Sequence, residues 1–251
     1  MLGGAPAEAS WGGPAHVFYW FLKYILLGPL LHVAYRTRVR GLENIPETGP
    51  VILASNHLSF VDSLFIPLMC PRPVVFLGKA DYFEKKRTAW FFRSVNVIPV
   101  RREGGSAGEA AIITGIRALR EGHVVGIYPE GTRSPDGRLY RGKTGVARMA
   151  LEGRATVIPV AVRGTPEVMP LEAKAPRLRG RPEVEFGRPL RFERYYDRPR
   201  DRFVLRSVTD EIMYEIMMLS GQEYVDEYAS KVKKEMDSAA RARSEATPVR
   251  G

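Results

Sequence analysis

The sequence has almost no cysteine and few lysines, and both shortages limit what the protein can be. A single cysteine among 251 residues excludes a disulfide-stabilised scaffold and a zinc site built on cysteines. Only 9 of the 38 basic residues are lysines, so arginine, which binds phosphate through paired hydrogen bonds, supplies most of the positive charge. A GC-rich genome would produce the same arginine bias without a functional cause. The chain also lacks internal repeats, and biased composition is confined to its ends.

The composition is that of a globular protein with an anionic partner. Hydrophobic residues make up 45% of the chain and charged residues 26%, which is ordinary for a folded domain and wrong for a disordered one. The length suits one α/β domain or two small domains. The net charge is 38 − 28 = +10. Nucleic acid, an anionic membrane and a phosphorylated substrate would each fit this charge.

The N-terminal region combines a loose start with a long apolar run. Residues 1–15 are mainly small residues and proline, and we expect them to be disordered. Residues 17–35 are almost all apolar or aromatic, a length that could just span a bilayer. Lys23 and His32 lie within the run, and Gly28-Pro29 interrupts it. We therefore expect two short helices, broken at Gly28-Pro29, that lie in or dip into a membrane, with a buried core helix as the alternative.

The flanks of this run bear on its orientation. No lysine or arginine precedes it, which is unlike an ordinary signal peptide. Arg36, Arg38 and Arg40 follow directly, as expected beside anionic headgroups or on the cytoplasmic side. We assign residues 16–36 to a membrane-associating helical segment and expect the protein at the cytoplasmic face of the cell membrane, held as a peripheral or monotopic protein.

After Arg40 the pattern is that of an α/β domain over residues 37–240, followed by a flexible tail at 241–251. Short apolar runs predict buried strands, at Val51–Ser55, Val74–Leu77, Val97–Val100, Val124–Tyr128 and Thr156–Val162, with a further strand at Glu183–Phe186. The segments between them predict helices, at Ser59–Met69, Arg87–Ser94, Ser106–Arg120 and Gly142–Leu151, and a last helix covers Arg202–Ala240. This alternation predicts a central, mostly parallel sheet flanked by helices.

A histidine and an aspartate follow the first of these strands. His57 and Asp62 would not meet on one regular helix, because five residues place them about 140° apart. If His57 lies in the turn before the helix, Asp62 can reach back and fix its tautomer, leaving the other ring nitrogen as a general base. Ser59 is placed to cap the helix or steady the loop. A satisfied structural histidine is the alternative, because short motifs match often by chance.

Polar residues also follow three other strands. Glu130 and Arg133 flank a Gly-Thr turn after Val124–Tyr128, where an arginine can clamp a phosphate. Lys79 follows the strand at 74–77, and Arg101 follows the strand at 97–100. A surface turn with a Glu–Arg pair and a solvated basic face are the alternatives. Four successive strand ends with such residues nevertheless predict a site at the carboxyl edge of the sheet.

These motifs resemble those of the glycerophospholipid acyltransferases, specifically the lysophosphatidic acid acyltransferases. The family's NHxSxxD motif is matched by Asn56, His57, Ser59 and Asp62, and its Phe-Pro-Glu-Gly-Thr-Arg-Ser motif by residues 128–134, with Tyr128 in place of the phenylalanine. Residues 97–101 resemble its second motif more loosely, and residues 157–162 its fourth. The resemblance covers roughly residues 40–190.

The resemblance implies acyl transfer to the free hydroxyl of 1-acyl-glycerol-3-phosphate, which gives phosphatidic acid. His57 would take the hydroxyl proton, oriented by Asp62, and no enzyme nucleophile would be needed, in agreement with the lack of a GxSxG sequence. The implied substrate-binding residues lie in the matched motifs and at the neighbouring strand ends: Asn56, Ser59, Lys79, Arg101, Glu130, Gly131, Thr132 and Arg133. The donor would be acyl-CoA or acyl-carrier protein, with no cofactor and no metal. Backbone N–H groups near the His57 turn could stabilise the oxyanion.

The sequence also permits two other functions and leaves the roles of several single residues undecided. The acceptor could instead be glycerol 3-phosphate, another lysophospholipid or a glycolipid, or the chain could be a non-enzymatic basic membrane-binding protein. Nucleic acid is not expected as a partner, because the sequence shows neither a basic helix nor interleaved aromatic platforms. Cys70 and His123 are expected to be structural, and residues 177–206 to meet anionic lipid or solvent. Residues 140–143 are expected to form a surface loop, with a phosphate-facing loop as the alternative.

Overall fold

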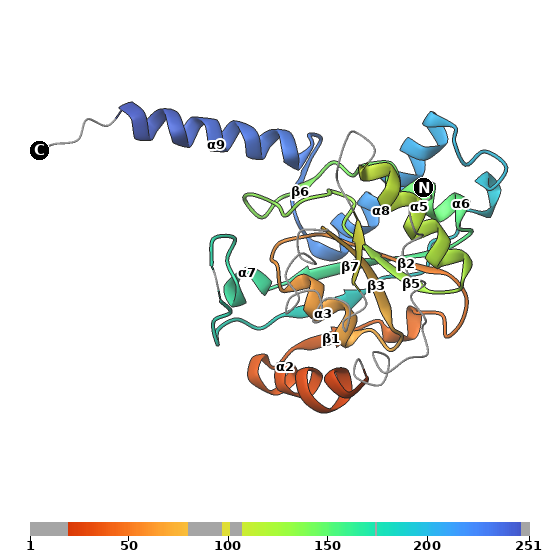
Figure 1. Ribbon diagram of the computed structural model, residues 1–251, viewed down its shortest axis with the longest axis horizontal. Helices are drawn as coiled ribbons and strands as arrows, with labels where there is room; N and C mark the ends of the chain where they lie inside the picture. The colour runs from red at the N-terminus through yellow and green to blue at the C-terminus, as the bar shows by residue number, and fades with distance from the viewer. Residues whose placement is uncertain (1–19, 80–96, 101–106, 174, 247–251) are drawn as a thin grey trace, which may run out of the picture.

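A seven-stranded sheet forms the centre of the protein (Figure 1). The computed structural model describes residues 20–79, 97–100, 107–173 and 175–246. The strand order is β1-β8-β7-β2-β5-β3-β4. The strands are β1 (Arg38–Arg40), β2 (Val51–Ser55), β3 (Val74–Lys79), β4 (Val97–Val100), β5 (Val124–Ile127), β7 (Thr156–Arg163) and β8 (Glu183–Phe186). All neighbours run parallel except β7 and β8, so the predicted mostly parallel α/β fold is confirmed.

Helices cover both faces of the sheet, because the central strands are buried on both sides. Every residue of β2 is buried, and alternate residues enter different cores. Ile52 and Ala54 pack with α5 (Ala107–Arg120), α6 (Gly145–Glu152) and α8 (Arg202–Ser220). Val51 and Leu53 pack with α3 (Asp62–Met69), with the end of α2 (Leu27–Tyr35) and with the short α7 (Thr165–Val168). Single-turn 3-10 helices, η2 (Leu42–Asn44) and η4 (Glu193–Tyr195), lie in the connections.

From Trp20 to Tyr35 the apolar N-terminal run is one continuous helix, so the expected break at Gly28-Pro29 is wrong. A π-helical turn, η1 (Leu22–Leu26), leads directly into α2. The wide turn brings the carbonyl of Lys23 against Gly28, where a Cβ would lie 1.9 Å from that oxygen, so only glycine fits there. In the described residues, no helix combines the length and the apolar character that crossing a bilayer requires.

The C-terminal region also differs from its prediction, because Arg202–Ala240 is not one helix. Gly221, in the left-handed conformation at φ 69°, ends α8. The chain then forms β9 (Tyr224–Val225), which pairs with β6 (Leu139–Tyr140), before α9 (Ala229–Ala246) extends away from the domain (Figure 1). Residues 241–246 of the expected tail form the last part of α9, and the flexibility of the tail stays a prediction.

Two other helices begin three residues later than predicted. The helix expected from Ser59 begins at Asp62, and the helix expected from Gly142 begins at Gly145. Residues 1–15, the expected helix at Arg87–Ser94 and residues 247–251 lie outside the described residues. The boundaries of the membrane-associating segment and of the acyltransferase domain stay predictions.

Candidate active site

The loop between β2 and α3 holds a histidine against an aspartate. His57 Nδ1 lies 2.9 Å from Asp62 Oδ2, and the exposed fraction of the two side chains is 15% and 0%. The same carboxylate oxygen accepts the backbone N–H groups of Leu58, at 2.7 Å, and Ser59, at 2.8 Å. The expected contact between His57 and Asp62 is therefore present, and it forms because the chain is not helical before Asp62.

This contact sets the chemistry of the imidazole. A carboxylate only accepts hydrogen bonds, so Nδ1 carries the proton toward Asp62 and Nε2 keeps its lone pair. No partner for Nε2 occurs among the residues that the structure describes. An oriented imidazole that is partly exposed and whose Nε2 keeps its lone pair has the geometry of a general base.

An aromatic ring forms one wall beside His57. The ring of Tyr128 stacks on the imidazole with 3.7 Å between centroids and 9° between planes. The phenol oxygen lies 2.9 Å from Ser63 Oγ on α3, and Phe76 of β3 also stacks on the tyrosine ring, with 5.6 Å between centroids. Burial, with the nearby charge of Asp62, raises the pKa of Tyr128 well above its usual value, so the phenol stays neutral.

Glu130 lies beneath the site and holds two loops together. Its exposed fraction is 1%, its Oε1 accepts the N–H of His57 at 3.3 Å, and its Oε2 accepts the N–H of Tyr140 at 3.0 Å. Burial raises its pKa to about 7, although the two backbone N–H groups oppose the shift. Both oxygens of Glu130 are engaged by the protein, and its expected contact with the acceptor stays a prediction.

Asn56 and Ser59 are buried and support the histidine loop, and their expected contacts with substrate stay predictions. Asn56 is fully buried, with its Nδ2 donating to Val162 O at 3.0 Å and its Oδ1 accepting Val162 N–H at 2.8 Å. The Ser59 hydroxyl is also buried and donates to Met169 O at 2.6 Å. These bonds fasten the histidine loop to the end of β7 and to the segment after α7.

Three backbone N–H groups of the His57 turn are engaged as well, so these three are not free to stabilise an oxyanion. The amide of His57 donates to Glu130, and the amides of Leu58 and Ser59 donate to Asp62. Sequence reasoning could not find this, because the acceptor for the His57 amide lies 73 residues away along the chain.

The turn after β5 places positive charge beside the histidine loop. Ser134 N–H donates to His57 O at 2.8 Å, which ties the turn to that loop. Arg133 donates through Nη1 to Leu171 O at 3.3 Å and remains partly exposed, as does Thr132. Among the described residues no carboxylate pairs with Arg133, so its charge is available to an anion.

Lys143 belongs to this cluster, although the sequence placed it on an ordinary surface loop. Gly131 has φ +73°, and a Cβ there would lie 3.0 Å from Lys143 Nζ, so the ammonium rests against the turn. Lys143 N–H also donates to Pro129 O at 2.8 Å. The lysine side chain is exposed and has no carboxylate partner in the described parts of the chain. The sequence had suggested a phosphate-facing loop at Tyr140–Lys143 as an alternative. Lys143 fits that alternative, whereas Tyr140 is fully buried.

The other two basic residues predicted at the site, Lys79 and Arg101, lie at and beyond the ends of the described segments. Lys79 is the last residue of β3 and pairs in register with Val100 of β4, which places its backbone at the same sheet edge as the ends of β2 and β5. The structure describes no more of Lys79, and Arg101 lies outside the described residues. Their expected contacts with phosphate stay predictions.

Cys70 and His123 have structural surroundings. Cys70 is fully buried, and burial raises the pKa of its thiol, which disfavours the nucleophilic thiolate. His123 Nε2 lies 3.5 Å from Glu121, and burial lowers the pKa of this histidine. Within the described ranges, no group of three or more histidine, cysteine, aspartate or glutamate residues could hold a metal ion.

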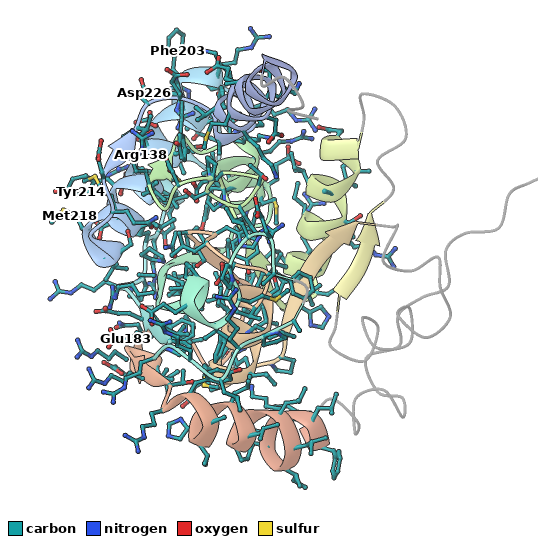
Figure 2. All side chains as sticks on the ribbon, turned by 90° about the vertical axis from the view of Figure 1, so that its left-hand side faces the viewer. Arg138, Glu183, Phe203, Tyr214, Met218 and Asp226 are labelled. Atoms are coloured by element: carbon teal, nitrogen blue, oxygen red, sulfur yellow. The ribbon has the colours of Figure 1, made fainter. Side chains whose placement is uncertain are left out.

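The basic segment at 177–206 is largely neutralised in its second half. Four of its arginines form ion pairs: Arg194 with Glu211, Arg198 with Asp201, Arg200 with Glu152, and Arg206 with Asp210. The exposed apolar side chains of α8, including those of Phe203, Tyr214 and Met218, lie on the outer surface of the molecule (Figure 2).

Comparison with known proteins identifies the family. A sequence model of the Acyltransferase family matches residues 36–163, just over half of the chain. A chloroplast 1-acyl-sn-glycerol-3-phosphate acyltransferase of Arabidopsis thaliana is 28% identical over 174 residues, which are 69% of this chain and 49% of that protein. The enzyme of that name from Bacillus subtilis is 32% identical over 61% of this chain and 73% of its own length.

A solved structure shows the same fold. The crystal structure of the 1-acyl-sn-glycerophosphate acyltransferase PlsC of Thermotoga maritima matches with a TM-score of 0.57 at 22% identity, over 80% of this chain and 77% of that chain. The chain spans about half the length of the plant relatives that it matches. The chain belongs to the Acyltransferase family, together with the 1-acyl-sn-glycerol-3-phosphate acyltransferases.

Proposed function

We propose that this protein transfers a fatty acyl group from a thioester donor to the free hydroxyl of 1-acyl-glycerol-3-phosphate, which yields phosphatidic acid. The observation that carries the proposal is the His57–Asp62 pair, whose open Nε2 lies in a loop tied to the turn that presents Arg133. The names of the relatives from Bacillus subtilis and Arabidopsis thaliana support the same activity.

His57 acts first as a base and then as an acid. Nε2 takes the proton of the acceptor hydroxyl while the oxygen attacks the carbonyl carbon of the thioester. The tetrahedral intermediate collapses, the carbon–sulfur bond breaks, and the departing thiolate takes the proton from the imidazolium. Asp62 holds the ring and stabilises its charge throughout. Atoms and charges balance without an acyl-enzyme.

The acceptor phosphate is bound by Arg133 and Lys143. Both side chains extend from the turn at residues 131–133 or rest against it, and both lack a carboxylate partner in the described structure. An arginine supplies paired N–H donors to phosphate oxygens, and a lysine adds a compact charge. Gly131 contributes the space in which the lysine lies.

The N-terminal helix attaches the enzyme to the bilayer in which the lysolipid resides. Apolar and aromatic side chains of the helix are exposed, with Ile25 at 67% and Val33 at 77%. An exposed apolar face of this kind partitions into the interface between headgroups and acyl chains. The basic residues that follow α2 favour attachment at the cytoplasmic face of the cell membrane.

Product analysis with a panel of substrates tests this proposal. Purified protein is incubated with 1-acyl-glycerol-3-phosphate and either acyl-CoA or acyl-carrier protein, and thiol release is compared with phosphatidic acid formed. The proposal expects one thiol for each phosphatidic acid and identifies the donor by the larger kcat/KM. Glycerol 3-phosphate, another lysophospholipid and monoacylglycerol serve as competing acceptors. A preference for the uncharged monoacylglycerol would contradict the role given to Arg133 and Lys143.

A further inference from the structure

A groove of about 550 Å³ opens beside the C-terminal end of α2, and no residue of the histidine loop lines it. Arg36, which directly follows α2, lines the groove together with Arg179 and Arg181. Glu167 of α7 and Leu178 also line the groove. The groove therefore joins two basic segments that are more than 140 residues apart in the sequence.

The charge of this groove is not neutralised within the protein. Arg36, Arg179 and Arg181 are exposed and have no ion-pair partner among the residues that the structure describes. Neighbouring arginines behave differently, because Arg38 pairs with Glu183 at 3.2 Å and Arg163 pairs with Glu185. Three guanidinium groups against the single carboxylate of Glu167 leave the groove with an excess positive charge.

The backbone on both sides of the groove is fixed. Gly180 has φ +95°, and a Cβ there would lie 2.8 Å from Glu167 Cβ, so this turn packs tightly against α7. Arg179 and Arg181 flank that glycine. On the α2 side, Arg38 N–H donates to Pro182 O at 3.0 Å and joins β1 to the same segment. The three guanidinium groups thus extend from ordered backbone.

The groove lies at the end of the exposed apolar face of the N-terminal helix. Side chains of α2 project from the lower edge of the molecule in Figure 2, with Glu183 of β8 just above them. Val33, three residues before Arg36, is 77% exposed, and Leu178 beside the arginines is 86% exposed. An apolar surface bordered by unpaired arginines is the arrangement expected at the boundary between acyl chains and headgroups.

We propose that this groove binds the phosphate-bearing headgroup of an anionic phospholipid in the bilayer that α2 contacts. Guanidinium groups match phosphate oxygens in charge and geometry, and Leu178 enters the acyl region beside the bound lipid. This inference rests on the proposed membrane attachment of α2, but it is independent of acyl transfer at His57. Three of the arginines that make up the net positive charge would then bind a lipid headgroup at a defined place.

Vesicle flotation tests the groove. The whole protein is mixed with phosphatidylcholine vesicles, or with vesicles of equal parts phosphatidylcholine and phosphatidic acid. The triple variant R36Q/R179Q/R181Q is compared with R188Q/R191Q/R202Q, which removes three exposed arginines outside the groove. Each membrane-facing arginine changes binding to anionic vesicles about fivefold, so the groove variant is expected to lose roughly 100-fold on anionic vesicles and nothing on neutral ones. The matched control is expected to lose far less.

Three outcomes separate this inference from the function it accompanies. Equal losses in the groove variant and the control variant would overturn it, because a diffuse basic surface would then explain the binding. Equal binding of the wild-type protein to neutral and anionic vesicles would overturn it as well, while the attachment of α2 would stand. Selective loss in the groove variant supports it, even if the wild-type protein forms no phosphatidic acid, a result that would refute only the proposed reaction.

Discussion

The ring of Tyr128 lies flat against the imidazole of His57, with 3.7 Å between their centroids. The tyrosine follows β5 and the histidine follows β2, two neighbouring parallel strands, so the sheet itself brings the rings together. The phenol hydroxyl contributes a separate bond to Ser63. The tyrosine ring therefore shields one face of the imidazole and limits its movement.

Removing the ring should cost more activity than removing its hydroxyl. Tyr128→Phe keeps the stacked wall and loses only the bond to Ser63, so we expect kcat close to that of the wild type. Tyr128→Ala opens one face of His57 to water and to movement, and we expect kcat to fall about 10- to 100-fold. Steady-state kinetics with matched thermal melts measure this. Equal kcat values for the alanine variant and the wild type would show that the stacking has no catalytic role.

Asp62→Asn should separate orientation of the histidine from binding of the substrate. The amide has the volume of the carboxylate, and its carbonyl can accept the same three N–H groups, because all of them bind Oδ2. The negative charge that stabilises the imidazolium is lost. We expect kcat to fall by about 10³- to 10⁴-fold with little change in the acceptor KM. Asp237→Asn, on the exposed part of α9, is the matched control. A large rise in KM with an unchanged kcat would assign Asp62 to substrate binding instead.

Buried Glu130 should make the stability of the protein depend on pH. Its pKa is raised from 4.5 in the unfolded chain to about 7 in the folded state, so the folded form holds a proton that the unfolded form releases. Stability therefore falls as pH rises through this window, by about 3 kcal/mol for this group.

The comparison with Glu130→Gln isolates that contribution. Urea unfolding of both proteins is measured at pH 4 and at pH 8. We expect the difference in unfolding free energy to move by about 3 kcal/mol in favour of the glutamine variant at the higher pH. A difference that is the same at both pH values would mean that Glu130 does not titrate in this range.

Lys143→Gln and Arg133→Gln should weaken acceptor binding more than catalysis. Loss of a charge-assisted hydrogen bond to the phosphate predicts an acceptor KM roughly 10- to 100-fold higher for each variant, with kcat changed much less. Lys231→Gln, an exposed change on α9, is the charge-matched control. If activity toward monoacylglycerol, which has no phosphate, fell by the same factor, this would show that the two side chains do not bind the acceptor phosphate.

The sequence predicted the parts of this structure that depend on local pattern. Short apolar runs located β2 and β4 to the residue, and the strand-like segment Glu183–Phe186 located β8. The spacing of His57 and Asp62 predicted their contact once the loop was taken as non-helical. The location of the candidate site at the carboxyl edge of the sheet was predicted from the parallel strands, because successive strand ends meet there.

The missed features depend on pairing between distant segments. The two-residue strands β6 and β9 carry no periodic pattern, and Arg38–Arg40 forms a strand only because it pairs with β8. Glu130 was expected to face the acceptor, since nothing local shows that its oxygens bind the amides of His57 and Tyr140. Gly221 was the one local indication that the long C-terminal helix ends early.

The most direct test follows phosphatidic acid formation by the wild-type protein and by His57→Ala under identical conditions. Both are assayed with 1-acyl-glycerol-3-phosphate and radiolabelled acyl-CoA, and circular dichroism confirms that both are folded. The account predicts steady phosphatidic acid formation by the wild type and a rate lower by about 10³-fold or more for the variant. Phosphatidic acid formed by His57→Ala at the wild-type rate would contradict it.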